Sequence, residues 1–202
     1  MLEVDLARPE SPRISASSAR DRRDRSLRRA AEALVMVHPG VEHLPDDDGL
    51  AELGEGCGVG PDDFLAINLR MGRRTFTMVC VRRAFWGGDG LRPFLRMKAL
   101  AATYGRAIVL VPESFIRREP RSSNALMIAG AAGVGTRLSE RMKILAHLIE
   151  NGGSAPLADL ANLVNGADPV AAVLNLIVEG GLHLDLDRSI LPSSEVHLVQ
   201  PV

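Results

Sequence analysis

The last third of the sequence constrains the fold most strongly. Three helical stretches follow one another there, separated by paired glycines and by Asp168-Pro169, a pair that favours the start of a helix. Two short alternating runs come next, at 182–185 and 196–199. Three helices followed by a β-hairpin predict a winged-helix domain over residues 136–202. Its first helix is expected to carry these apolar residues on one face: Leu138, Met142, Leu145 and Leu148.

Residues 20–135, which precede this domain, predict an α/β domain. Runs rich in apolar and β-branched side chains flank Gly72 and predict a hairpin, and a continuous apolar run further on is typical of a buried strand. The expected fold is a restriction-endonuclease-like mixed sheet flanked by helices, with a flexible tail at 1–19 and a loop at 45–63. The expected elements are helices at 21–38, 93–104 and 123–132 and strands at 64–69, 75–81 and 107–111.

Composition narrows the class of protein. The chain has 202 residues, 46% of them hydrophobic, which is enough for two cores. No apolar run approaches the length of about 18 residues that a membrane helix needs, and the first residues lack the apolar segment of a secretory signal. The two cysteines, Cys57 and Cys80, have no partner at metal-binding spacing and are typical of a reducing compartment. We therefore expect a cytoplasmic protein that makes no contact with membranes.

Charge is unevenly distributed along the chain. Residues 42–63 carry eight acids and no Lys or Arg, residues 64–121 have a net charge of +9, and residues 154–202 have a net charge of −5. The middle segment alone has the charge to hold a polyanion such as DNA. The alternative is that its arginines form a solvated face paired with the neighbouring acids. The candidate nucleic-acid-binding residues are Arg70, Arg73, Arg74, Arg82, Arg83, Arg92, Arg96 and Lys98.

Four short motifs occur in a characteristic order. They are HPGV at 38–41, PDDFL at 61–65, AIVLVPE at 107–113 and GLHLDL at 181–186. This order resembles that of the TnsA-type transposon endonucleases, members of the PD-(D/E)XK restriction-endonuclease-like superfamily. The resemblance covers roughly residues 20–199 and implies a nuclease-like domain followed by a winged helix.

The same resemblance implies where a catalytic metal site would lie. In the family an aspartate begins the first strand of the hairpin, which Asp62 or Asp63 matches, and the second strand carries an acid, one residue and a lysine. Here Cys80 replaces the acid and Arg82 replaces the lysine. A neutral thiol is a poor ligand for Mg²⁺, and an arginine does not release its proton to act as a base. Lys98 on the next helix is the one candidate to replace the lysine.

These residues predict a degenerate site, in which Arg82 forms an ion pair with Asp62 or Asp63 and no cofactor is bound. The leading hypothesis is a TnsA-like protein that binds DNA without cleaving it and contacts a partner protein through its acidic winged helix. In that domain the third helix offers only Asn175 as an uncharged long polar group. One alternative is a Mg²⁺-dependent endonuclease that uses Asp62 or Asp63, Glu113 and Lys98. Another is a structural or oligomerising protein without nucleic acid.

Overall fold

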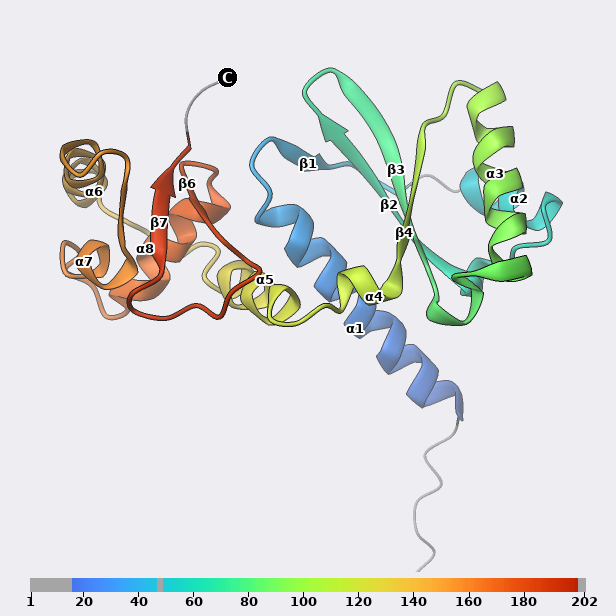
Figure 1. The fold of residues 1–202 in the computed structure, drawn as a ribbon, viewed down its shortest axis with the longest axis horizontal. Coiled ribbons are helices and arrows are strands. Elements are labelled where there is room, and N and C mark those ends of the chain that lie inside the picture. Colours follow the sequence, from blue (N-terminus) through green and yellow to red (C-terminus); the bar gives the residue numbers. More distant parts are fainter. Residues whose placement is uncertain (1–15, 47–48, 200–202) are drawn as a thin grey trace, which may run out of the picture.

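Two sheets organise the chain (Figure 1). A computed structural model describes residues 16–46 and 49–199. The helices are α1 (Ala16–Met36), α2 (Gly49–Gly56), α3 (Arg92–Thr103), α4 (Glu113–Ile116), α5 (Arg121–Gly130), α6 (Leu138–Glu150), α7 (Leu157–Ala161) and α8 (Pro169–Val178). The strands are β1 (Val41–His43), β2 (Phe64–Met71), β3 (Arg74–Val81), β4 (Ile108–Pro112), β5 (Ser154–Pro156), β6 (Leu182–Leu184) and β7 (Glu195–Leu198).

The first sheet has four strands in the order β1-β2-β3-β4. The first three strands are antiparallel, whereas β4 runs parallel to β3. Gly72 forms the tip of the β2–β3 hairpin with φ +58°, a left-handed conformation that favours glycine. The fold is therefore α/β, with a mixed sheet flanked by helices, as the sequence predicted.

The two faces of this sheet pack against different helices. Along β3 successive side chains point to opposite faces, so that Val79 and Val81 pack with α3 and α2, whereas Cys80 packs with α1. Any group on α1 and any group on α3 are consequently separated by the sheet.

Two sequence predictions for this half of the chain were wrong in part. The predicted loop at 45–63 contains α2, whose Leu50 and Leu53 pack into the core of the α3 side; its glycines concealed this short helix. The helix α1 begins at Ala16, so the last four residues of the predicted tail are helical, while residues 1–15 of that prediction lie outside the described residues.

The second sheet has three antiparallel strands in the order β5-β7-β6, surrounded by α6, α7 and α8. Its hydrophobic core also takes in residues from α5 and from the end of α1, among them Ile128 and Val37. In Figure 1, α5 lies between the two sheets and packs against α1, which passes below the four-stranded sheet. The predicted domain boundary at 135 therefore falls within a stretch that contributes to this core on both sides, because Ala131 is part of it as well.

In two helices of this half, the residues that are buried differ from those predicted. On α6, Ile144 and Leu148 are buried, whereas Leu138 and Met142 are 75% and 59% exposed. The helix α8 is apolar on nearly all sides and is buried from Ala172 to Ile177, as such helices are, whereas Val170 in its first turn is exposed. Asn175 is therefore not a surface group: its side chain accepts a hydrogen bond from the Gly133 N–H at 2.9 Å and donates one to Glu179 at 2.8 Å.

Candidate nucleic-acid interface

The hairpin brings the predicted metal-site residues to one end of the four-stranded sheet. Asp62 and Asp63 lie just before β2, and Arg82 follows β3. The Arg82 N–H donates to the Asp63 carbonyl at 3.3 Å, and Cys80 lies opposite Leu65 in the strand register. The topology thus assembles the positions that the resemblance indicated, although their side chains interact differently from the prediction.

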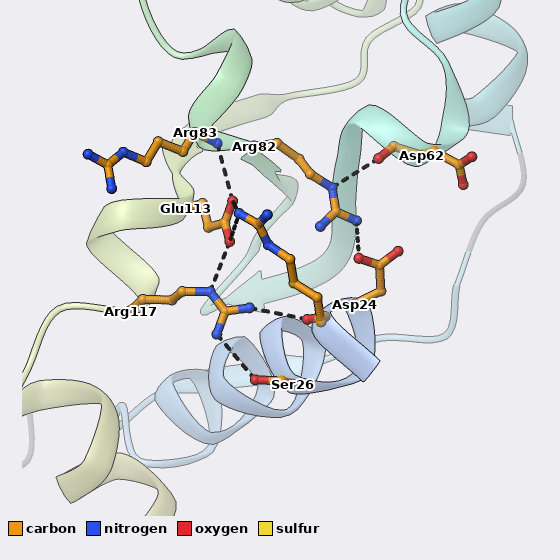
Figure 2. Close-up of polar contacts among 8 residues, drawn as sticks. Asp24, Ser26, Asp62, Arg82, Arg83, Glu113 and Arg117 are labelled. Carbon is orange, nitrogen blue, oxygen red and sulfur yellow. Dashed lines mark hydrogen bonds and ion pairs between the residues drawn. The ribbon is translucent and has the colours of Figure 1, made fainter. Parts of the chain in front are cut away.

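The Arg82 guanidinium forms its ion pair with a residue of α1. Its Nη2 lies 2.6 Å from Asp24 Oδ1, and its Nε donates to the main-chain carbonyl of Asp62 at 2.9 Å (Figure 2). The side chain of Asp63 turns back and accepts a hydrogen bond from the Gly60 N–H at 2.9 Å. The expected ion pair of Arg82 with Asp62 or Asp63 is therefore wrong, because α1 crosses this face of the sheet and supplies the acid.

Cys80 lies on the same face and is completely buried. Burial raises the pKa of its thiol to about 12, and the nearby charge of Glu113 acts in the same direction. The thiol therefore stays protonated at neutral pH and does not supply the anionic ligand that an acid would provide at this position.

Besides Arg82, Glu113 is the residue that makes most of the polar contacts at this end of the sheet. It is the first residue of α4, directly after β4, and its side chain is only 3% exposed. Its carboxylate accepts hydrogen bonds from Arg117 Nε at 2.9 Å, from the Arg83 main-chain N–H at 3.2 Å, and from Arg23 Nη2 at 3.2 and 3.3 Å (Figure 2). One carboxylate thus joins α1, α4 and the residue after Arg82.

These donors keep Glu113 ionised despite its burial. Burial alone would raise the pKa of the carboxyl group, but the hydrogen bonds from Arg117, the Arg83 N–H and Arg23 outweigh it and leave the pKa below its ordinary value. The charged carboxylate in turn fixes Arg117, whose Nη1 donates to Ser26 Oγ at 3.2 Å and whose Nη2 donates to the Arg23 carbonyl at 3.1 Å.

Lys98 lies elsewhere. The helix α3 packs on the sheet through Phe94, Met97 and Ala101, on the face opposite to α1, and Lys98 is exposed on the outer side of that helix. The endonuclease alternative requires Lys98 to lie close to Glu113, but the sheet separates these two residues. Across residues 16–46 and 49–199, no group of three or more His, Cys, Asp or Glu side chains is placed to hold a metal ion.

The predicted nucleic-acid-binding residues divide into two groups. Arg70, Arg73 and Arg74 lie at the hairpin tip, whereas Arg82 and Arg83 lie at the opposite end of β3. The seven residue steps of this strand separate the two ends by about 23 Å, at about 3.3 Å per residue. Three further candidates lie in the first two turns of α3: Arg92, Arg96 and Lys98.

The arginines also differ in how they are paired. Arg70 forms a two-pronged contact with Glu42, at 2.9 and 2.5 Å, and Arg92 lies 3.2 Å from Asp89 in a largely exposed pair. Within the described part of the chain, the side chains of Arg73, Arg74 and Arg83 form no ion pair. The hairpin tip and the end of the sheet therefore each present free positive charge.

Sequence reasoning missed Asp24 and Arg117 as members of the site. The spacing of Glu113 and Arg117 on a helix was a readable i, i+4 pair, whereas no local pattern indicated Asp24. Comparison of the chain with family models, with curated proteins and with solved structures returned no match. In the described ranges no helix combines the length and the apolar character that crossing a bilayer requires.

Proposed function

We propose that this chain binds DNA through the end of its four-stranded sheet, as a TnsA-like protein whose catalytic metal site has been replaced by arginines. The observation that carries the proposal is the position of the Arg82 side chain. Its guanidinium lies between the Asp24 carboxylate and the Asp62 carbonyl, at 2.6 and 2.9 Å, at the end of the sheet where the resemblance to the TnsA-type endonucleases implies carboxylates around Mg²⁺. On this proposal, a cation of the chain itself takes the place of the metal ion.

The other acid at this end is used in the same way. Glu113 already accepts hydrogen bonds from Arg23 and Arg117, so a metal ion would have to displace arginines in order to bind there. The alternative of Mg²⁺-dependent cleavage by Asp62 or Asp63, Glu113 and Lys98 gains no support, since Lys98 lies across the sheet. Binding without cleavage agrees better with these contacts.

We further propose that the C-terminal part is a winged helix that contacts a protein and not DNA. Its order of elements (α6, β5, α7, α8, β6, β7) supports this architecture. The helix α8, which would have to enter a DNA groove as the third helix of such a domain, is buried over residues 172–177 and has no basic side chain. Residues 154–202 carry a net charge of −5, which phosphates would repel.

Titration of duplex DNA against salt tests the proposal. The logarithm of the binding constant should fall linearly with the logarithm of salt concentration, by about 0.9 for each phosphate contacted. Replacing both Arg23 and Arg83 with alanine should flatten this slope by about 1–2. The matched control replaces Arg137 and Lys143 with alanine, which removes two exposed positive charges from the C-terminal part. Absence of binding by the unmodified protein would overturn the proposal.

A second candidate function, a structural or oligomerising role without nucleic acid, is favoured by one observation. Several arginines are engaged by acids of the same chain, among them Arg70 with Glu42 and Arg121 with Asp187. In this case the duplex titration shows no binding at physiological salt.

A further inference from the structure

An open pocket of about 510 Å³ lies at the end of the sheet, beside the Arg82 ion pair. We call it the sheet-end pocket. It lies where α1, the end of β3 and α4 meet, and Figure 2 labels Ser26, Arg83, Glu113 and Arg117 of its lining. Its lining is Arg23, Ser26, Arg83, Glu113, Ser114 and Arg117.

The charges of the lining favour an anion. The lining residues comprise three arginines and one carboxylate, so they carry a net charge of two positive units. The guanidinium groups of Arg23 and Arg117 meet Glu113, whereas the Arg83 side chain extends away from it (Figure 2). The Glu113 carboxylate is only 3% exposed and is covered by its hydrogen-bond donors. An incoming anion therefore meets the arginines before it meets the acid.

The hydrogen-bond donors divide into fixed and available ones. Each nitrogen of the Arg117 guanidinium already has an acceptor: Nε on Glu113, Nη1 on Ser26 and Nη2 on the Arg23 carbonyl. Arg23 contacts Glu113 through Nη2 alone, and its side chain is 60% exposed. The Arg83 side chain, by contrast, has no ion pair within the described residues.

From this arrangement we propose that the sheet-end pocket binds one phosphate group, with Arg23 and Arg83 as its direct ligands. Guanidinium groups suit phosphate because their N–H donors form paired, charge-assisted hydrogen bonds with its oxygens. The exposed Ser114 hydroxyl is a further donor on the rim. Glu113 and Arg117 act as positioning residues, since they hold α1 and α4 at the distance that keeps the pocket open.

The phosphate has two possible sources, a phosphodiester of DNA or a free phosphate group. With DNA as the source, the inference rests on the proposed function; with free phosphate it does not. The test therefore uses two probes, inorganic phosphate and a short duplex of mixed sequence. Binding is followed by NMR at the Nε–H signal of Arg117, which its hydrogen bond to Glu113 holds in place, and by titration of affinity.

The variant is Arg83→Ala, and the matched control is Arg118→Ala. Arg118 is exposed and lies next to Arg117 in the sequence, but it does not line the pocket. Because both side chains are exposed, both variants should fold. Arg83→Ala should weaken binding of either probe by about tenfold, the loss expected for a hydrogen bond to a charged group, whereas Arg118→Ala should change it by less than about twofold.

Each outcome supports or overturns a separate claim. If both probes shift the Arg117 NMR signal, and Arg83→Ala but not Arg118→Ala weakens their binding, the phosphate pocket and the DNA-binding proposal both hold. If phosphate binds in this way but the duplex does not, the pocket takes free phosphate and the DNA-binding proposal fails. If the duplex binds while the Arg117 signal stays unchanged and Arg83→Ala behaves like Arg118→Ala, the phosphate pocket is refuted and DNA binds elsewhere.

Discussion

The two ends of the four-stranded sheet are both rich in arginine, but they are built differently. At the hairpin tip the arginines are neighbours in sequence, and Arg70 meets its acid, Glu42, in an exposed pair with side chains 46% and 60% accessible. At the other end the side chains of Arg23 and Arg117 and the main-chain N–H of Arg83 come from distant parts of the chain and meet at the buried Glu113. The pairing at the tip is thus exposed, whereas the sheet end holds Arg117, and Arg23 through one nitrogen, on a buried carboxylate.

This difference shows that density of charge along a sequence is a poor guide to charge geometry. An exposed ion pair contributes little to stability, because water already solvates both partners. A buried carboxylate depends on its donors, since removal of one partner leaves an unsatisfied group. The sheet end should therefore respond to mutation far more strongly than the tip.

The largest effect is expected for Glu113→Gln. Glutamine keeps the shape of the side chain but removes the charge that Arg23 and Arg117 compensate, leaving these guanidinium groups without their acid. The free energy of unfolding should fall by about 2 kcal/mol, the contribution of hydrogen bonds to a charged group, as measured by chemical denaturation. The matched substitution at the tip, Glu42→Gln, should cost less than about 0.5 kcal/mol. Equal losses for the two variants would show that the two ends do not differ.

A smaller effect, which depends on pH, should distinguish the unmodified protein from Glu113→Gln. Because the pKa of folded Glu113 lies below its ordinary value, its contribution to stability is complete above the pKa of the unfolded chain and is lost as the pH falls through the folded pKa. The unmodified protein should therefore lose more stability than Glu113→Gln between neutral pH and acid pH. The two unfolding free energies, measured by denaturant titration at successive pH values, should converge at the acid end. A constant gap between them would contradict this origin of the stability.

The elements of the sheet were readable from the sequence because they rely on local patterns. The runs on either side of Gly72 became β2 and β3, and the apolar run 107–111 became β4 with a shift of one residue. The helix α2 was missed because its few apolar residues, such as Leu50, are diluted by glycine. On α6 the face bearing Leu138 points to solvent instead, because the choice between two apolar faces depends on what packs against the helix.

The candidate site was readable only in part, for a related reason. The positions of Asp62, Asp63, Cys80 and Arg82 follow from the hairpin, so their gathering at one end could be predicted. The partner of Arg82 could not, because it lies on a helix from another part of the chain. Likewise, 90 residues separate Glu113 from Arg23 and 30 separate it from Arg83, and contacts at such distances depend on tertiary structure.

The smallest effect on stability is expected at the hairpin tip, for the double replacement of Arg73 and Arg74 with alanine. Both side chains are exposed and lack ion pairs within the described residues, so the free energy of unfolding should change by less than about 0.5 kcal/mol. Phosphate binding at the sheet-end pocket should also stay unchanged, since about 23 Å separates the two ends of the strand.

DNA binding by the tip variant should nevertheless depend on the length of the duplex. Because DNA rises 3.4 Å per base pair on each strand, about seven base pairs are needed to reach from the sheet-end pocket to the tip. With a longer duplex the double variant should therefore flatten the salt slope by about 1–2, whereas with a hairpin duplex of about five base pairs it should match the unmodified protein. Flattening of the slope with the short duplex would show that the tip binds DNA by itself. No change with either duplex would confine DNA contact to the sheet end, where Arg23 and Arg83 are the proposed ligands.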